Sequence, residues 1–565
     1  MKFILVFFLC SCSLLAQTDY PKDYFRSPLD IPLQLSGNFG ELRPNHFHAG
    51  FDMKTQQREG LKVYAVADGY VARIKISTFG NGKTIYINHP NGYTSVYGHL
   101  QNAVGSIHDI ITKAQYKEQS FEVELFFKPD EVPVKKGDVI ALSGNTGASE
   151  GPHLHFEFRD TASEFVINPL LFGYDSLLKD TKKPTISGLY VYPLDGNTTV
   201  NYAKRPLLLN VSLQKDGSYL SDKVIANGVI GFGITANDTD DVSFNSNGVY
   251  KVQSFLNGKP NFGYEFNTYS FEDMRYINAL IDYPRYKTTQ QRVQKLFMKT
   301  PYNLRFIQTD ETKGVLTVSP NLSLLYRIEV ADFFGNKKMI NVPIQYDLTS
   351  TRIAKEEVSG PYRVKAAKDS NFEMENASVF FPAGTFYDDF NLNFKAKNNT
   401  VTVHDDSVPA HSNFTITIKD STLTAAQREK RFIGRVDGKK ISYNATFRKD
   451  DFFQTKVKVL GTYALVSDTV APRISMAIPI EGKWINQQKS VQLTIADDLS
   501  GIKSYNGYLN GKWVLFEYDN KTRKITHFFT EGLVADGANE LKVVVVDNMG
   551  NSTTFETRFF RNSKP

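Results

Sequence analysis

Cysteine is almost absent from this sequence. Only two of the 565 residues are cysteines, Cys10 and Cys12, and both lie in an N-terminal leader. Once the leader is processed the chain has no disulfide bond, so its stability must come from hydrophobic cores. Long apolar runs are missing as well, because no later segment reaches the roughly 18 consecutive apolar residues that indicate a transmembrane helix. We therefore expect no membrane-spanning helix.

A strong excess of charge of one sign is also lacking. The formal net charge is +6, which is small for a chain of this length. This charge is compatible with a mild preference for an anionic surface or polymer, and equally with a solvated surface that has no partner. We expect no nucleic-acid partner.

The first residues, MKFILVFFLCSCSLLAQTDYP, have the form of a secretory signal peptide. Lys2 precedes an apolar run over residues 3–9, and small residues then lead to Ala16, after which we expect cleavage. The predicted signal peptide is therefore residues 1–16. The letters LCSC also resemble a lipoprotein signal, in which Cys12 would carry a lipid, and the sequence leaves both forms open. Either form predicts an exported protein of the periplasm or cell envelope, soluble or lipid-anchored.

Short runs that alternate apolar and polar residues recur along the whole chain, separated by Gly, Asn, Asp and Pro. This pattern is typical of strands and turns, so we predict a mainly β protein. The clearest hairpin covers residues 83–100, where two alternating runs flank Asn91-Gly92, a dipeptide suited to a tight turn. Helical signals are scarce, and the best of them, QQRVQKLF at residues 290–297, has the character of an insertion.

A chain of this length is expected to form about three to four domains. Four short motifs occur twice in the same order, which indicates an internal repeat. They lie at Asp180, Asp238, Leu256 and Asp332 in the first copy, and at Asp468, Asp498, Leu509 and Asp547 in the second. We therefore predict two related domains, residues 180–347 with insertions and residues 468–562. The second copy has the size of a β-sandwich and resembles bacterial immunoglobulin-like domains.

Another β-rich domain is predicted between the two copies, at residues 351–467. We identify no chemistry in it, because its histidines, His404 and His411, lie in polar, loop-like sequence. The paired acidic residues of the repeat could be calcium ligands. Asp and Asn that form turns by bonding to their own backbone explain them better.

Histidines are concentrated near the N-terminus, where seven of the ten lie within the first 155 residues. His153 and His155 are two apart in a predicted strand, so both side chains lie on the same side of it. His48 and Asp52 are four apart and share a face as well, and His99 ends the predicted hairpin. A His, an Asp and a further His are good zinc ligands that leave a fourth position for water, while the two remaining histidines could handle protons. Three isolated histidines are instead assigned to hydrogen-bonded structure or the surface: His46, His89 and His108.

Five stretches between Ser36 and Phe172 form a recognisable pattern: GNFGELRPNHFHAGFDMKT, GLKVYAVADGYVARI, GNGKTIYINHPNGYTSVYGHL, VKKGDVIALSGNTGASEGPHLHFEFR and NPLLF. With these stretches, the segment resembles the lysostaphin-type, or LytM-like, zinc endopeptidases. We therefore predict an antiparallel β peptidase domain over residues 24–175, followed by several β-sandwich, immunoglobulin-like domains.

The resemblance implies that His48, Asp52 and His155 bind one Zn²⁺ per chain, and that His99 and His153 assist catalysis without binding the metal. Which of these two is the general base stays open. The resemblance further implies hydrolysis of the peptide cross-links of bacterial peptidoglycan, with the β-domains holding the enzyme near this substrate or near an envelope protein partner. Two alternatives are a catalytically silent protein that binds peptidoglycan or activates an amidase, and an adhesive or structural envelope protein.

The sequence departs from the compact family pattern in one place. An insertion of about thirty residues, at 103–132, follows His99 and contains the alternating run SFEVELFF, which predicts an added strand or hairpin. Because the resemblance places His99 in the active cleft, we expect the insertion to border the cleft and to limit access to it.

Overall fold

Strands dominate the computed structural model, which contains 47% strand and 8% helix. The mainly β fold predicted from the sequence is therefore confirmed. The predicted signal peptide, with Cys10 and Cys12, lies outside the described residues. The structure describes residues 19–562 except 301, 303, 321–322, 348–359 and 530–532.

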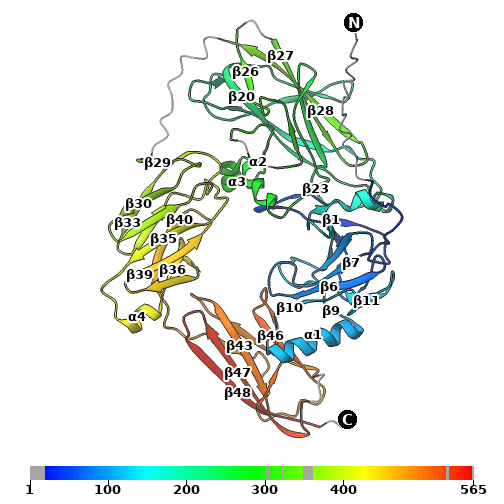
Figure 1. The fold of residues 1–565 in the computed structure, drawn as a ribbon, viewed down its shortest axis with the longest axis vertical. Helices are drawn as coiled ribbons and strands as arrows, with labels where there is room; N and C mark the ends of the chain where they lie inside the picture. Colours follow the sequence, from blue (N-terminus) through cyan, green and yellow to red (C-terminus); the bar gives the residue numbers. More distant parts are fainter. Residues whose placement is uncertain are drawn as a thin grey trace, which may run out of the picture.

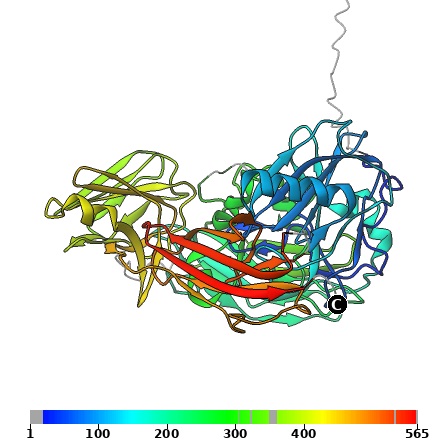
Figure 2. The same cartoon turned by 90° about the horizontal axis from the view of Figure 1, so that it is seen from below.

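The chain is arranged as a ring of β-rich units that closes on itself (Figure 1). From the blue N-terminal unit it passes through a green and a yellow unit, and the red C-terminal strands return to lie beside helix α1 (Gly105–Glu118). The view from below shows the same approach of the C-terminal strands to the N-terminal unit (Figure 2).

The N-terminal unit is built around an antiparallel sheet in which β13 is flanked by β4 and β8. This placement matters because all three strands carry or adjoin predicted site residues. The strand order is β1 (Leu35–Gly37), β4 (Phe51–Lys54), β13 (His153–Asp160), β8 (Tyr93–Gly98), β7 (Lys83–Asn88), β6 (Gly69–Ile76) and β10 (Val123–Phe126).

Strand β13 separates an apolar face from a polar one, because successive side chains of a strand point to opposite sides. Three of its side chains are completely buried in the core: Leu154, Phe156 and Phe158. The alternate side chains therefore lie on the opposite face: His153, His155 and Glu157.

The predicted hairpin is confirmed. Strands β7 and β8 pair antiparallel, with Ile85 opposite Tyr97 and Asn88 opposite Thr94. In the turn Gly92 has a φ of 86°, a conformation that glycine adopts without steric cost. As a result, β8 ends directly before His99.

The insertion at 103–132 forms helix α1 and strand β10, which pairs with β6 and extends the sheet. The strand predicted from SFEVELFF is confirmed, whereas the sequence does not predict the helix. Ile107 and Ile111 give α1 a buried apolar side, but Val104 at its N-cap makes no side-chain hydrogen bond. The usual start signal of a helix is therefore missing.

Helix α1 packs against the C-terminal unit. The ring centroid of Tyr116 lies 5.2 Å from that of Trp513, and the Tyr116 hydroxyl accepts a hydrogen bond from the Leu515 N–H at 3.4 Å. Nearby, Lys83 Nζ lies 2.8 Å from a carboxylate oxygen of Glu517. The insertion therefore helps to close the ring of units.

We expect Trp513→Ala to weaken this closure, because an aromatic pair contributes about 0.5–1.5 kcal/mol beyond its buried area. Small-angle X-ray scattering should show a larger radius of gyration than for wild type. Trp484→Ala is the matched control, since Trp484 is the only other tryptophan and is 62% exposed. An unchanged scattering profile for the Trp513 variant would contradict this role of α1.

The second unit contains a 13-stranded sheet that shares one hydrophobic core with the N-terminal unit. At their junction the rings of Phe47 and Phe306 lie 5.3 Å apart. The long strands of the sheet follow the order β15 (Thr185–Pro193), β20 (Val224–Asn237), β28 (Lys337–Tyr346), β27 (Ser323–Ala331), β21 (Lys251–Leu256) and β22 (Lys259–Glu265).

The helix predicted over residues 290–297 is wrong. Helix α3 (Tyr283–Thr289) ends directly before this segment, and its C-cap residue Gln290 has a left-handed φ of 62°. Strand β24 (Gln294–Lys295) instead pairs with β20. Val293 and two further apolar residues of the segment are buried, so packing against the sheet outweighs the local helical pattern.

The last two units each enclose a core of their own. Residues 362–467 include two five-stranded sheets. In the C-terminal unit two four-stranded sheets share one core, so this unit is a β-sandwich. Its relation to immunoglobulin-like domains stays a prediction. The domain boundaries expected from the sequence stay predictions as well. The two sheets are β41 (Arg473–Ser475), β42 (Ser490–Ala496), β46 (Lys524–Phe528) and β45 (Glu517–Asp519), and β44 (Lys512–Val514), β43 (Ile502–Leu509), β47 (Gly537–Asp547) and β48 (Ser552–Arg561).

Candidate active site

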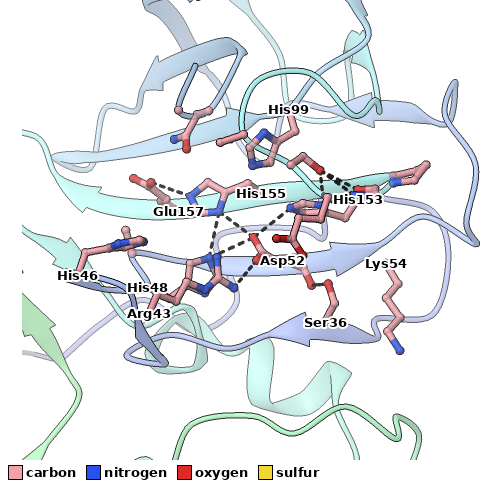
Figure 3. Close-up of a pocket in the computed structure, with 18 of the residues that line it drawn as sticks. Ser36, Arg43, His46, His48, Asp52, Lys54, His99, His153, His155 and Glu157 are labelled. Atoms are coloured by element: carbon pink, nitrogen blue, oxygen red, sulfur yellow. Dashed lines mark hydrogen bonds and ion pairs between the residues drawn. The ribbon is translucent and has the colours of Figure 1, made fainter. Parts of the chain in front are cut away.

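A cleft of about 1180 Å³ lies over the polar face of β13. Figure 3 shows the side chains that converge on it from neighbouring strands. The structure brings all five predicted site residues into this one cleft: His48, Asp52, His99, His153 and His155.

The register of the strands explains this convergence. His155 on β13 lies directly opposite Asp52 on β4 and, on its other side, opposite Gly98 on β8. His48 lies just before β4, and His99 directly follows β8 with a φ of 57°. Residues that are distant in the sequence are therefore neighbours across three strands.

Three of these side chains offer atoms that could hold a metal ion. Asp52 Oδ1 lies 2.9 Å from His155 Nδ1 and 3.1 Å from His48 Nε2, and the two nitrogens are 3.2 Å apart. At most 5% of each residue is exposed. Two imidazole nitrogens and one carboxylate oxygen form a donor set that suits zinc.

The outer nitrogens of both imidazoles are also engaged. His48 Nδ1–H donates to the carbonyl of Asn38 at 2.8 Å, and His155 Nε2–H donates to Glu157 Oε1 at 2.8 Å. Each bond selects the tautomer whose other nitrogen faces the cluster. Such outer partners orient metal-binding histidines and raise their basicity.

Glu157 and Arg159 are candidates that the sequence analysis misses. Glu157 is 1% exposed, and Arg159 Nε donates to its Oε2 at 2.7 Å. Burial alone would raise the pKa of Glu157, but Arg159 and His155 outweigh it and lower the pKa to about 2, so the carboxylate is ionised. The signal lies in the spacing H-x-H-x-E-x-R, which places all four side chains on one face of β13.

The protonation of the cluster is uneven. Burial lowers the pKa of His48 to about 4. Burial also opposes protonation of His155, but hydrogen bonds to Asp52 and Glu157 outweigh it and raise the pKa to about 9. A cation bound between these residues must displace the proton of His155, so binding is expected to release a proton near neutral pH.

His99 and His153 flank the three-residue cluster. His99 Nδ1–H donates to the carbonyl of Thr146 at 2.8 Å, and His153 Nδ1–H donates to that of Gly151 at 2.8 Å. Their rings are 4.7 Å apart, and His153 Nε2 lies 3.4 Å from Asp52 Oδ1. Burial and the two neighbouring histidines lower the pKa of His99 to about 3, so its imidazole is neutral.

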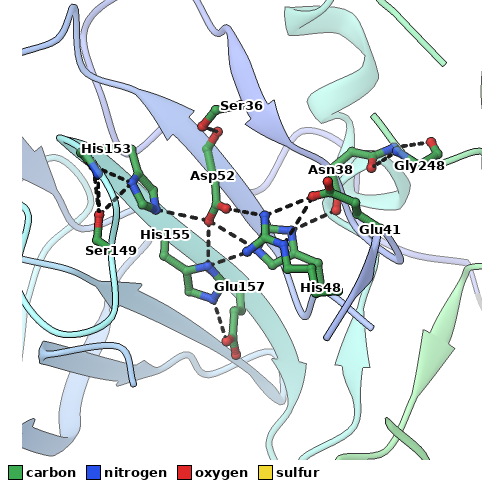
Figure 4. A network of polar contacts seen from close by, with 12 residues as sticks. Ser36, Asn38, Glu41, His48, Asp52, Ser149, His153, His155, Glu157 and Gly248 are labelled. Carbon is green, nitrogen blue, oxygen red and sulfur yellow. Dashed lines mark hydrogen bonds and ion pairs between the residues drawn. The ribbon is translucent and has the colours of Figure 1, made fainter. Parts of the chain in front are cut away.

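The second unit contacts the segment that leads to His48 (Figure 4). Asn38 Nδ2 donates to the carbonyl of Gly248 at 2.7 Å, and the Gly248 N–H donates to Asn38 Oδ1 at 2.9 Å. The hydroxyl of Tyr269 donates to the carbonyl of His48. The segment that carries His48 is therefore held between two units.

Arg43 and His46 also line the cleft. The Arg43 guanidinium lies 2.5 Å from Asp52 Oδ2 and 2.9 Å from Glu41, so the second oxygen of Asp52 is paired while Oδ1 faces the histidines. His46 is exposed and its Nδ1 lies 2.9 Å from the carbonyl of Pro44. Its assignment to hydrogen-bonded surface holds, but the sequence does not predict its place in the cleft.

The other two isolated histidines agree with the prediction. His89 is buried and hydrogen-bonded, with Nδ1 2.9 Å from the carbonyl of Asp68 and Nε2 2.8 Å from Ser95 Oγ. His108 is exposed on α1.

The expectation that the insertion borders the cleft is wrong. All of residues 103–132 are described, and none of them lines the cleft. Strand β10 adds to the edge of the sheet farthest from β13, and α1 packs against the C-terminal unit. The residues that line the cleft instead include the segment 148–152 and, from the second unit, Phe271 and Met274.

The C-terminal unit contacts the segment beside the cleft through Lys521. Its ammonium group donates to the carbonyls of Asn145 and Ser149. Ser149 Oγ in turn lies 3.1 Å from His153 Nδ1. Three units of the ring therefore contact the surroundings of the histidine cluster.

We expect Glu157→Gln to lower the metal affinity of the cluster by about 10–100-fold, because the carboxylate that orients His155 loses its charge. Equilibrium dialysis against zinc at fixed pH measures this effect. Glu164→Gln is the matched control, since Glu164 also pairs with Arg159 but its side chain is 65% exposed. Equal affinities for the two variants would show that Glu157 does not tune the site.

Two family models match the chain. Peptidase family M23 matches residues 46–116 and 124–169, and the Zu5-like domain matches residues 361–468. The first match contains all five predicted site residues. The gap in it falls within the insertion. The second match coincides with the unit for which the sequence shows no chemistry.

Named relatives match the same N-terminal region. An uncharacterized metalloprotease of Haemophilus influenzae is 34% identical over 158 residues, which are 26% of this chain and 27% of the relative. The peptidoglycan DD-endopeptidase ShyC of Vibrio cholerae is 32% identical over 143 residues, or 24% and 27% of the two chains. A crystal structure of a zinc containing peptidase from Vibrio cholerae is 29% identical, covers 24% of this chain and 36% of that chain, and has a TM-score of 0.18.

The chain thus spans only 27% of the length of each of these two relatives. None of the described helices has the length and apolarity needed to cross a membrane.

Proposed function

We propose that this chain, which carries a domain of peptidase family M23 within residues 46–169, is a zinc-dependent endopeptidase that hydrolyses peptide cross-links of bacterial peptidoglycan. The observation that carries the proposal is the convergence of His48, Asp52 and His155 beneath one cleft, with two further imidazoles beside them.

The donor set fits one zinc ion per chain. His48 Nε2, a carboxylate oxygen of Asp52 and His155 Nδ1 would hold it, because these atoms lie within 4.8 Å of one another and the outer nitrogens of both histidines are already hydrogen-bonded. Zinc in such a site supplies Lewis-acid chemistry, polarising a carbonyl group and lowering the pKa of water toward ~7.

His99 and His153 are proposed to move the protons. Each is fixed through Nδ1–H, which leaves Nε2 able to accept a proton from the attacking water. The resulting imidazolium can stabilise negative charge on the carbonyl oxygen and then protonate the amine that leaves. The geometry is compatible with either histidine as the base.

The relatives support peptidoglycan as the substrate class. Besides ShyC, they include the DD-carboxypeptidase/endopeptidase Mpg of Neisseria meningitidis, 33% identical over 112 residues. The predicted signal peptide supports action outside the cytoplasm, in the periplasm or cell envelope. The cleft is lined by residues of two units, among them Gln56 of the N-terminal unit and Met274 of the second unit, so both units could contact the substrate.

Digestion of purified peptidoglycan with the full chain tests the proposal. Mass analysis of the released fragments should show cleaved cross-links and identify the bond that is cut. A chain that sediments with peptidoglycan but releases no fragments in the presence of zinc would support the silent binding protein instead and would overturn the endopeptidase proposal.

A further inference from the structure

Three aspartates of the first repeat copy meet where strands begin and end. Asp238 directly follows β20 and Asp332 directly follows β27, while Asp180 precedes β15. Their carboxylate oxygens lie within 4.8 Å of one another. The repeated motifs therefore bring acidic side chains to one place.

One of these carboxylates has a buried oxygen with no partner. Asp238 is 7% exposed, and no hydrogen bond reaches its buried Oδ1 within the described part of the chain. Asn247, which exchanges two backbone hydrogen bonds with Asp238, has a buried, unpaired Oδ1 as well. Both residues line a cavity of about 40 Å³ together with Asp180 and Asp332. Burying a carboxyl or amide oxygen without a partner is unfavourable, so both oxygens would be stabilised by a cation or a hydrogen-bond donor in the cavity.

The second repeat copy has the same arrangement. Asp468, Asp497 and Asp547 also place carboxylate oxygens within 4.8 Å of one another. Asp468 and Asp547 are at most 1% exposed. Beside them, Ser500 is 1% exposed and its Oγ is buried without a hydrogen-bond partner among the described residues.

An asparagine fixes each cluster in the same way. Asn336 Nδ2 donates to the third aspartate of the first cluster at 2.7 Å and to the carbonyl of the first aspartate at 3.2 Å. Asn551 makes the same two bonds in the second cluster, at 2.7 and 3.1 Å. Two copies with different sequences therefore preserve one acidic geometry.

The turn-forming role favoured by the sequence is present but does not account for the clusters. Asp497 Oδ1, for example, accepts the N–H groups of Leu499 and Gly501 at 3.1 and 2.6 Å. A carboxylate has a second oxygen and further lone pairs, so turn formation leaves room for a cation. Asp238 Oδ1 makes no such turn bond.

Negative charges on the three aspartates of the first cluster repel one another. Burial, followed by the neighbouring Asp180 and Asp332, raises the pKa of Asp238 to about 8. Burial also raises the pKa of Asp497, with smaller contributions from Asp468 and Asp547.

We propose that each cluster binds one calcium ion, the first through Asp180, Asp238, Asp332 and Asn247, and the second through Asp468, Asp497 and Asp547. All side-chain donors are oxygens, which hard cations prefer and zinc does not require. Calcium tolerates six to eight irregularly placed oxygens, whereas magnesium demands a near-octahedral set and retains water. Sites in extracellular modules bind calcium with Kd on the order of 10⁻⁴ to 10⁻³ M, and we expect this range.

The first site lies at the junction with the N-terminal unit. Asn38 lines the same cavity, and its side chain exchanges two hydrogen bonds with Gly248, the residue after Asn247. The carbonyl of Asn38 accepts the Nδ1–H of His48. Calcium in the first site would therefore act as a positioning element for the segment that carries His48, whether or not the proposed peptidase activity is correct.

Isothermal titration of the full, zinc-loaded chain with CaCl₂ tests the proposal. We expect two calcium ions per chain for wild type, one each for Asp238→Asn and Asp547→Asn, and none for the double variant. Asp498→Asn is the matched control, because Asp498 adjoins Asp497 but is exposed and pairs with Arg473, so it should keep both ions. MgCl₂ should compete at least about tenfold more weakly.

Thermal unfolding gives a second readout that does not require the variants to bind. Calcium at about 100 times Kd should raise the Tm of wild type by about 5 °C or more. Above pH 8, where Asp238 is ionised, Asp238→Asn should melt at or above wild type without calcium, because a repelling charge is gone, and should lose part of the calcium-dependent rise. If wild type binds no calcium, the cavity holds only water and the proposal is overturned. It is equally overturned if Asp238→Asn lowers Tm by the same amount with and without calcium, since the carboxylate would then be purely structural.

Discussion

Replacement of His155 by alanine is expected to abolish metal binding and hydrolysis together. The variant loses one of three clustered donor atoms, so zinc affinity should fall by more than the roughly 100-fold caused by changes in outer partners. It also leaves the buried, ionised Glu157 without the imidazole at 2.8 Å. Elemental analysis after gel filtration measures the zinc, and fragment release from peptidoglycan measures the activity.

Two variants accompany this experiment. Asp52→Ala should lose zinc in the same way, because Oδ1 of Asp52 contacts both histidines of the proposed donor set. His108→Ala is the matched control, since His108 belongs to the same unit but is exposed on α1. Full zinc occupancy in the Asp52 variant would show that the ligands are assigned wrongly.

Replacement of His99 or His153 by alanine is expected to abolish activity as well, but with zinc binding retained. Neither imidazole belongs to the clustered donor set, and general acid–base catalysis contributes about 10²–10⁴-fold. We therefore expect kcat/KM for a soluble cross-link peptide to fall by that factor in His99→Ala and in His153→Ala, with zinc content unchanged.

His46→Ala provides the control for this pair, because His46 lines the same cleft but is exposed and outside the cluster. It should change kcat/KM by less than about tenfold. If His153→Ala loses its metal while His155→Ala retains it, the roles of these two residues are reversed.

The sequence predicts the histidine cluster because its members carry local signals. Alternation places His153 and His155 on one face, and the hairpin around Asn91-Gly92 delivers His99 to its end. The same alternation extends to Glu157 and Arg159, so the sequence pattern places these two side chains on the face that carries the histidines. The sequence cannot predict the support from Asn38 and Gly248, because that contact joins residues 210 positions apart.

Elsewhere, tertiary contacts decide what local patterns leave ambiguous. Residues 290–297 look helical in isolation, but Gln294 and Lys295 pair with β20 and the apolar side chains of the segment are buried: Val293, Leu296 and Phe297. Helix α1 begins without a capping side chain, so its start carries no signal. In the repeat, the motifs align Asp238 with Asp498, whereas the structure uses the neighbouring Asp497. Spacing in the sequence locates an acidic pair but does not say which member points inward.

The contact of Lys521 with Asn145 and Ser149 links two equilibria that are otherwise separate, the docking of the C-terminal unit and the ordering of the loop before His153. Thermodynamic linkage makes such a coupling reciprocal. A substrate that orders this loop must tighten the ring by the same free energy with which ring closure favours the substrate. If the proposed function is correct, a force that pulls the C-terminal unit away is therefore expected to weaken substrate binding while the proposed metal ligands stay in place.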